Sequence, residues 1–214
     1  MTDSAGAAGR RRIVVAITGA SGAPYGVRAV EMLRAIPEVE THLIITSGAR
    51  KTLAYETATD AAALVKLADV VYHEDDLAAP ISSGSFRTDG MVVIPCSIKT
   101  LSGVANCHDD NLVVRAADVM LKERRRLVLV VRETPLHLSH LRLMTEVTAA
   151  GGIIVPPVPA FYHHPQTVDD IVSQTVGRVF DLFGLDVKAV QRWEGGQQAA
   201  RRARAHRTTD GPAD

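Results

Sequence analysis

This sequence of 214 residues lacks the features that mark several specialised classes of protein. Its two cysteines, Cys96 and Cys107, are too few for a disulfide scaffold and suit a reducing cytoplasm, where we expect both to be small buried side chains. The 24 basic residues match the 24 acidic ones, so no net charge attracts nucleic acid or an anionic membrane. No apolar run approaches a membrane span, and we expect no secretory signal near residues 1–9. The composition therefore indicates a globular cytoplasmic protein.

What the chain does have is a strand, a turn of small residues and a helix start in direct succession at residues 13–26. Ile13–Ile17 is a β-branched apolar run, typical of a strand buried on both faces. The turn Thr18–Ala23 has only small side chains, and Pro24 suits the first turn of a helix. The free N–H groups and the dipole of such a helix favour an anionic ligand. The same pattern is also found in tight connections that bind nothing.

This turn does not have the pattern of the common nucleotide-binding loops. Gly19-Ala20-Ser21-Gly22 lacks the G-x-G-x-x-G spacing, and no Gly-Lys-Ser/Thr follows it as in a P-loop. The second expected strand ends in Thr46 and Ser47, where a dinucleotide site would carry an acid for the ribose. A nicotinamide dinucleotide is therefore disfavoured.

Apolar strands alternate with helices along the rest of the chain. The expected strands are 13–17, 41–46, 70–72, 91–94, 127–131 and 153–155. The expected helices are 24–34, 49–56, 60–67, one that opens at 97–100, 112–122, 141–150 and 168–183. Asn111 can cap the helix at 112, and Thr167 and Asp170 bracket a capping box before the last helix. This alternation predicts an α/β fold, a doubly wound and mostly parallel sheet of the Rossmann-like or flavodoxin-like kind, in a single domain. We expect a disordered arm at 1–10, the domain at 11–194, and a disordered basic tail at 195–214.

Polar side chains recur directly after the expected strands. They are Ser21, Thr46, Ser97 to Thr100, Arg132 with Glu133, and Tyr162. Because the carboxyl ends of parallel strands share one edge, these residues predict a single site at that edge. Arg132 and Glu133 are either a surface ion pair or a phosphate-binding arginine beside an acid–base glutamate.

Six motifs, in order along the chain, together resemble the flavin prenyltransferase (UbiX) family. They cover roughly residues 13–193 and read Thr18-Gly19-Ala20-Ser21-Gly22-Ala23, Ser82-Ser83-Gly84-Ser85-Phe86, Pro95-Cys96-Ser97-Ile98-Lys99-Thr100, Leu121-Lys122-Glu123-Arg124-Arg125, Arg132-Glu133-Thr134-Pro135-Leu136 and Pro159-Ala160-Phe161-Tyr162-His163. The resemblance implies transfer of a dimethylallyl group from dimethylallyl phosphate to N5 and C6 of reduced FMN, without a metal. The prenylated FMN serves a partner decarboxylase, and the family forms homo-oligomers, typically dodecamers, with sites between subunits.

The resemblance also implies roles for individual residues. FMN would be held by Gly19, Ala20, Ser21, Thr46, Ser97, Ile98, Lys99, Thr100 and Arg132. The prenyl phosphate would be bound by Lys122, Arg132, Tyr162 and Arg178. Proton handling would fall to Ser21, Glu56 and Glu133. These residue types suit the transfer of a dimethylallyl group. A leaving phosphate needs cations and a proton donor, and an allylic cation needs a π-rich surface.

Some positions depart from the family pattern, and other functions stay open. Thr46 stands where serine is common and His164 where arginine is often seen, and the tail beyond Trp193 is longer than expected. The alternatives are a direct aromatic-acid decarboxylase, an accessory subunit of one, or an FMN-binding electron-transfer protein. A metal site of His137, His140, His163 and His164 is disfavoured by Pro135 and the loop context. The sequence does not choose between a monophosphate and a diphosphate donor.

Overall fold

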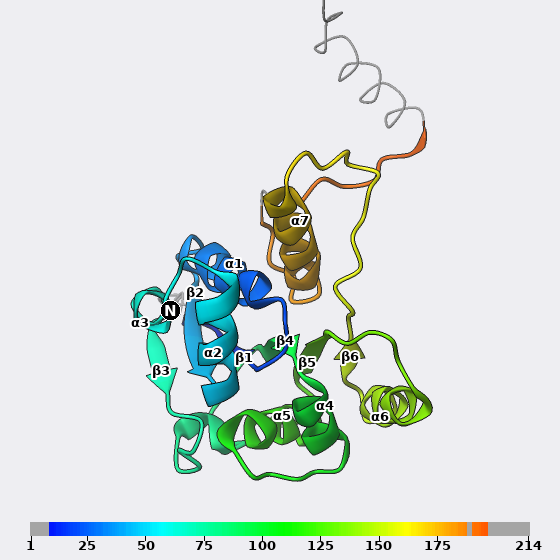
Figure 1. The fold of residues 1–214 in the computed structure, drawn as a ribbon. Helices are drawn as coiled ribbons and strands as arrows, with labels where there is room; N and C mark the ends of the chain where they lie inside the picture. The colour runs from blue at the N-terminus through cyan, green and yellow to red at the C-terminus, as the bar shows by residue number, and fades with distance from the viewer. Residues whose placement is uncertain (1–8, 188–189, 197–214) are drawn as a thin grey trace, which may run out of the picture. The chain divides into compact units, whose positions relative to one another are not determined.

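The computed structural model describes residues 9–187 and 190–196. The chain divides into two compact units, one up to Pro157 and the other from Val158. The first unit holds one sheet of six strands, all parallel, in the order β3-β2-β1-β4-β5-β6 (Figure 1). The strands are β1 (Arg11–Ile17), β2 (Val39–Ile45), β3 (Val70–Tyr72), β4 (Gly90–Cys96), β5 (Arg126–Val131) and β6 (Ile153–Ile154). This confirms the predicted doubly wound α/β fold.

The helices of the first unit begin where polar caps stand in the sequence. They are α1 (Ala23–Arg34), α2 (Ser47–Glu56), α3 (Ala61–Val65), α4 (Ile98–Ala105), α5 (Leu112–Lys122) and α6 (Leu138–Ala149), with a 3₁₀ turn at Pro80–Ser82. Thr46, Ser97 and Asn111 each accept a hydrogen bond from a backbone N–H of the first helical turn. Pro24 lies in the first turn of α1, as predicted.

The core of the first unit is built from the two faces of its central strands. Val14, Met91 and Leu127, neighbours across β1, β4 and β5, are fully buried in one cluster with α5. α4 and α5 lie side by side against this part of the sheet (Figure 1). On the other face α1 approaches closely, because a Cβ on Gly26 would lie 2.7 Å from the Ile94 carbonyl oxygen. This packing holds the start of α1 over the ends of β1 and β4.

The second unit contains α7 (Val168–Asp181) and the segments on either side of it. The predicted capping box is present, since Thr167 accepts from the Asp170 N–H and the Asp170 carboxylate accepts from the Thr167 N–H. The helix ends at Asp181, two residues before the predicted end, and Gly184 follows with φ +65°. This unit carries Tyr162 and Arg178.

The structure corrects the prediction for one of the cysteines. Cys96 is fully buried, and its burial raises the pKa of the thiol, which therefore stays protonated at neutral pH. Cys107 is exposed, because it lies in the turn after α4 with φ 52°. Most of the predicted arm (1–10) and tail (195–214) lies outside the described residues, and the domain boundaries stay predictions. In the described part no helix has both the length and the apolar composition to cross a bilayer.

Candidate active site at the carboxyl edge of the sheet

Thr18 joins the carboxyl ends of β1 and β4, where the strand order reverses. Its side chain is buried, 1% exposed, and its hydroxyl donates to the Pro95 carbonyl oxygen at 2.8 Å. The same hydroxyl oxygen accepts from the Ser97 N–H at 2.9 Å. A reversal of strand order is where open α/β sheets bind ligands. Thr18 therefore fixes the two loops that frame this position relative to each other.

The loops after β1 and β2 touch through two glycines. A Cβ on Gly19 would lie 3.1 Å from backbone carbons of Gly48, and a Cβ on Gly48 would lie 3.2 Å from Gly19 Cα. Any larger residue at either place would push the loops apart. The contact brings Gly19 and Ala20 beside the start of α2, which Thr46 caps. Three predicted flavin-binding residues thus share one edge.

The N-terminus of α1 binds a carboxylate of the protein itself, that of Glu56. The carboxylate of Glu56, the last residue of α2, accepts from the N–H groups of Gly22 at 2.8 Å and Ala23 at 2.9 Å. The sequence left open whether this helix start binds an external anion or no ligand. Glu56 occupies it because Gly22, with φ 106°, turns both N–H groups toward α2.

Glu56 is also linked to Ser21 and Arg132. Burial raises the pKa of Glu56, but hydrogen bonds from the Ser21 hydroxyl and the Gly22 and Ala23 N–H groups, with the charge of Arg132, lower it overall. At neutral pH Glu56 is therefore an ionised acceptor for the Ser21 proton. Arg132 also acts on Tyr25 of α1, whose pKa burial raises and the Arg132 charge lowers to a smaller extent. The structure brings Ser21, Glu56 and Arg132 together, as predicted, and adds Tyr25.

The start of α4 is a helix terminus available to an external phosphate. Its cap, Ser97, accepts from the Thr100 N–H at 3.3 Å, and the Ser97 and Thr100 hydroxyl oxygens lie 3.1 Å apart. The N–H groups of Ile98 and Lys99 belong to the first turn of α4, where backbone N–H groups have no carbonyl acceptor within the helix. The Lys99 side chain is exposed. These four predicted FMN-binding residues thus combine hydroxyls, free N–H groups and a positive charge, the donor set that binds phosphate.

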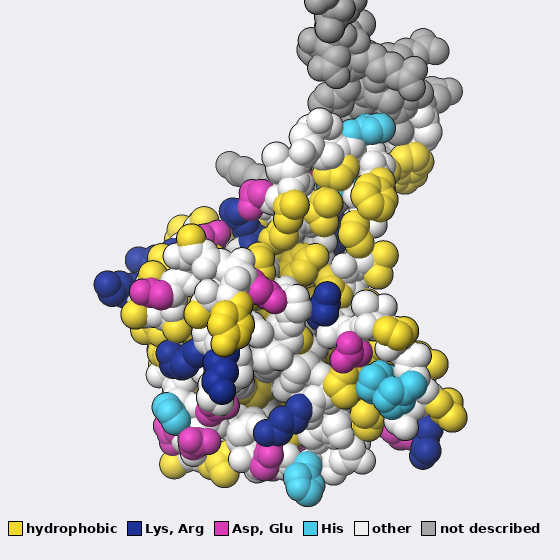
Figure 2. Space-filling view, viewed as in Figure 1, with side chains coloured by type: hydrophobic (Ala, Val, Ile, Leu, Met, Phe, Trp, Pro, Cys, Tyr) yellow, Lys and Arg dark blue, Asp and Glu magenta, His cyan; other side chains and the backbone are white. Residues whose placement is uncertain are grey.

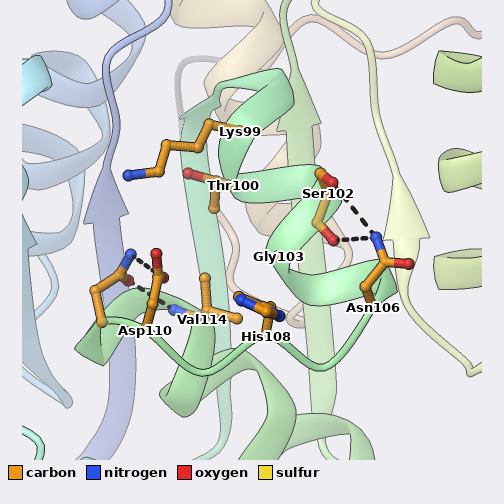
Figure 3. A pocket seen from close by; sticks show the side chains of 9 residues that line it. Lys99, Thr100, Ser102, Gly103, Asn106, His108, Asp110 and Val114 are labelled. Carbon is orange, nitrogen blue, oxygen red and sulfur yellow. Dashed lines mark hydrogen bonds between the residues drawn. The ribbon is translucent and has the colours of Figure 1, made fainter.

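A hollow of ≈ 560 Å³ adjoins this helix start (Figure 3). Its walls are formed by Lys99, Thr100, Ser102, Gly103, Asn106, His108, Asp110, Asn111 and Val114. Figure 3 shows Lys99 and Thr100 on α4, with His108 and Asp110 in the loop that leads to α5. The hollow therefore extends the polar surface from the predicted flavin residues down one side of α4.

Arg132 and Glu133 follow β5 but do not form an ion pair with each other in the described part of the chain. The Arg132 N–H donates to the Cys96 carbonyl oxygen at 3.1 Å, which ties the residue to the end of β4. The Glu133 carboxylate accepts from the Thr134 N–H at 3.0 Å and is exposed. The two side chains thus have separate surroundings, and the surface ion pair considered for them is not formed.

Lys122 lies at the opposite edge of the sheet from this site. It is the last residue of α5, shortly before β5, whose first residue Arg126 pairs with Gly90 at the start of β4. Arg132 follows the far end of β5, roughly 20 Å away at about 3.3 Å per residue. Lys122 pairs with Glu123 at 2.6 Å, and both lie over Gly84, where a Cβ would come within 2.7 Å of the Lys122 ammonium. Within one chain, Lys122 and Arg132 therefore do not meet.

The second unit arranges the remaining predicted phosphate ligands. The Tyr162 hydroxyl donates to the Gln191 carbonyl oxygen at 3.2 Å, and Arg178 pairs with Asp181. His163 is buried with no hydrogen-bond partner for its ring nitrogens among the described residues. His137, a member of the histidine set that the sequence disfavours as a metal site, caps α6 by accepting from the Ser139 N–H.

Two residues of the site were missed from the sequence. Thr18 is the first residue of the predicted turn and Tyr25 follows it, but only the folded chain shows that Thr18 joins two strands and that Tyr25 lies near Arg132. A hydroxyl at the buried end of a strand was the available signal for Thr18, because such a group must find partners.

Comparison with known proteins gives consistent matches across most of the chain. The profile of the family described as Flavoprotein matches residues 2–180. The chain is 55% identical over 187 residues to the flavin prenyltransferase UbiX of Escherichia coli K12, covering 86% of this chain and 99% of that protein. It is also 55% identical over 194 residues to a probable UbiX-like flavin prenyltransferase of Streptomyces sp. strain D7, covering 91% and 97%.

Two solved structures match the fold closely. One is AnUbiX (PadA1) in complex with FMN and dimethylallyl pyrophosphate, with a TM-score of 0.86 at 54% identity, covering 87% of this chain and 99% of that one. The other is a dodecameric FMN-dependent UbiX-like decarboxylase from Escherichia coli O157:H7, with a TM-score of 0.85 at 53% identity, covering 86% and 100%.

Proposed function

The chain belongs to the flavin prenyltransferase (UbiX) family, and we propose that it joins a dimethylallyl group from dimethylallyl phosphate to N5 and C6 of reduced FMN. The observation that supports this proposal most directly is the site at the carboxyl edge of the sheet. There an ionised Glu56 lies with Ser21 and Arg132, and the neighbouring start of α4 has the groups that bind phosphate. The product, prenylated FMN, serves a partner decarboxylase, and the protein works in the cytoplasm.

The residues at the start of α4 fit the phosphate of FMN. The Ser97 hydroxyl oxygen accepts from the Thr100 N–H, and the Ser97 and Thr100 hydroxyls share one hydrogen bond, which leaves one hydroxyl proton to donate to a ligand. Lys99 adds a positive charge. Gly19 and Gly48 pack against each other, which holds the turn after β1 close to the start of α2 at this edge of the sheet. Reduced FMN, when bound, supplies the nucleophilic nitrogen and carbon of the reaction. These features support FMN binding by Gly19, Ala20, Ser21, Thr46, Ser97, Ile98, Lys99, Thr100 and Arg132.

Ser21, Glu56 and Glu133 would move the protons. The ionised Glu56 accepts the hydrogen bond of Ser21 and so orients that hydroxyl. Glu133 is exposed beside the end of β5 and would act as the second acid or base of the site. The Arg132 cation favours departure of a phosphate dianion from the allylic carbon. The chain thus supplies a base, an acid and a cation around the predicted flavin site.

Lys122 would act on the prenyl phosphate of a neighbouring subunit. It lies at the amino edge, while Arg132 and Glu133 lie at the carboxyl edge. Exposed apolar residues of the kind that subunits bury include Leu138 and Leu141 on α6. Figure 2 shows hydrophobic side chains in yellow at several places on the visible surface. A homo-oligomer of twelve subunits, the state of the dodecameric relative, would complete each site with a lysine from a second copy.

The product of the reaction tests the proposed function. Anaerobic incubation of the purified protein with reduced FMN and dimethylallyl monophosphate should yield a flavin heavier by one dimethylallyl group, as measured by mass spectrometry. A parallel incubation with the diphosphate identifies the donor. Unchanged flavin in both, or release of carbon dioxide from an aromatic acid without a partner enzyme, would favour the decarboxylase alternative.

Mixed assemblies of two inactive variants should recover activity. Lys122→Ala removes the amino-edge cation and Glu133→Gln removes the carboxyl-edge acid. If each site takes these residues from different copies, random mixing restores about one quarter of the sites, because each residue is intact in about half of the chains. The variants would be co-expressed with different tags and the mixed assemblies purified. Mixed assemblies no more active than either parent would place both residues in one subunit's site.

A further inference from the structure

Gln174 is a polar side chain buried in the second unit. It lies on α7 and is 3% exposed. Its Nε2 donates to the Tyr162 hydroxyl oxygen at 3.0 Å and to the Gln191 carbonyl oxygen at 2.9 Å, and its Oε1 accepts from the Gln191 N–H at 2.9 Å. A buried amide is costly unless its polar atoms are paired, and here they are. Gln174 is therefore held in one orientation.

This arrangement fixes which hydrogen bond Tyr162 can offer. The hydroxyl oxygen accepts from Gln174, so its proton is directed away from the Gln174 amide, to the Gln191 carbonyl oxygen at 3.2 Å. The Tyr162 ring is 36% exposed, and the Trp193 ring packs against it edge to face at 5.7 Å. A hydroxyl that donates its proton and accepts from an amide is suited to a phosphate oxygen, which only accepts.

The second phosphate residue on α7 lies one turn from Gln174. Arg178 is four residues further along, on the same side of the helix. It pairs with Asp181, which also binds Arg192 through two hydrogen bonds of 2.9 Å. One face of α7 therefore carries the Arg178 cation and the Gln174 amide, which orients the hydroxyl of Tyr162.

We propose that Gln174 is a positioning residue for prenyl-phosphate binding, acting through the Tyr162 hydroxyl without touching the donor. The inference rests on the proposed function, which assigns Tyr162 and Arg178 to the donor. Losing the Gln174 amide frees the hydroxyl to rotate, so that its proton no longer faces one fixed acceptor. Donor binding then weakens, while the FMN-binding residues of the first unit keep their contacts.

The test compares Gln174→Met with Gln166→Met. Both replace glutamine by an unbranched apolar chain, but Gln166 is exposed and donates to the His164 carbonyl oxygen, away from the Tyr162 hydroxyl. Gln174→Met should raise KM for dimethylallyl monophosphate about 3- to 10-fold, the effect of one lost neutral hydrogen bond. The FMN affinity should stay within twofold of wild type, and the control should match wild type throughout. A normal KM in folded Gln174→Met would overturn the proposal.

A double-mutant cycle separates positioning from general support of the fold. In a Tyr162→Phe background there is no hydroxyl to orient, so Gln174→Met should add little to the KM increase of Tyr162→Phe. Fully additive effects would show that Gln174 acts by another route. If Gln174→Met does not fold, Gln174→Glu keeps the size and the acceptor, loses the donor, and should raise KM similarly. Failure of the wild-type protein to prenylate FMN would instead contradict the proposed function.

Discussion

Glu133→Gln should slow formation of prenylated FMN by about 10²–10⁴-fold, the loss expected when a general acid or base is removed. The amide has the size of the acid but neither takes nor gives the proton. In the structure Glu133 is exposed, and its carboxylate accepts from the Thr134 N–H. An amide oxygen can keep that bond, so the fold and FMN binding should persist. Single-turnover product formation, with FMN occupancy measured alongside, gives the rate.

The matched control for this substitution is Glu146→Gln. Glu146 is an exposed acid on α6, outside the proposed site. It should turn over at the wild-type rate. A Glu133→Gln protein that is equally fast, or one that is slow only because FMN is lost, would assign Glu133 a structural role.

Glu56→Gln should also reduce the rate strongly, by about 10²-fold or more. Its carboxylate accepts from the Gly22 and Ala23 N–H groups and from Ser21. An amide oxygen turned toward the N–H groups leaves an NH₂ facing Ser21, which then has no acceptor for its proton. Because hydrogen bonds keep the Glu56 pKa below its ordinary value, the acid is ionised between about pH 6 and 8. The ratio of wild-type to variant rates should therefore be constant across this range.

Combining this variant with Ser21→Ala tests whether the two residues act as a pair. If Glu56 works through the Ser21 hydroxyl, the double variant should be no slower than the slower single variant. Multiplicative losses would mean independent roles. A rate ratio that rises steeply between pH 6 and 8 would contradict the ionised state assigned to Glu56.

The sequence by itself determined the fold class and most of the element order. Ile13–Ile17 of β1 and Met91–Ile94 of β4 are continuous apolar runs, and such runs are specified by local composition because both faces must be buried. Helix caps such as Asn111 and Thr167 could also be predicted from the sequence, because each side chain accepts from a backbone N–H only three residues away. The recurrence of polar residues after strands located the carboxyl edge, because every parallel strand ends there.

Only the tertiary structure decided which polar groups meet. It placed Glu56, over thirty residues from Gly22, on the N–H groups that the sequence had left either for an external anion or without a ligand. It put Lys122 and Arg132 at opposite edges, although they are ten residues apart in sequence, because β5 runs between them. It also paired Gln174 with Tyr162 and Gln191. These contacts depend on the path of the chain between distant residues, and no local spacing encodes that path.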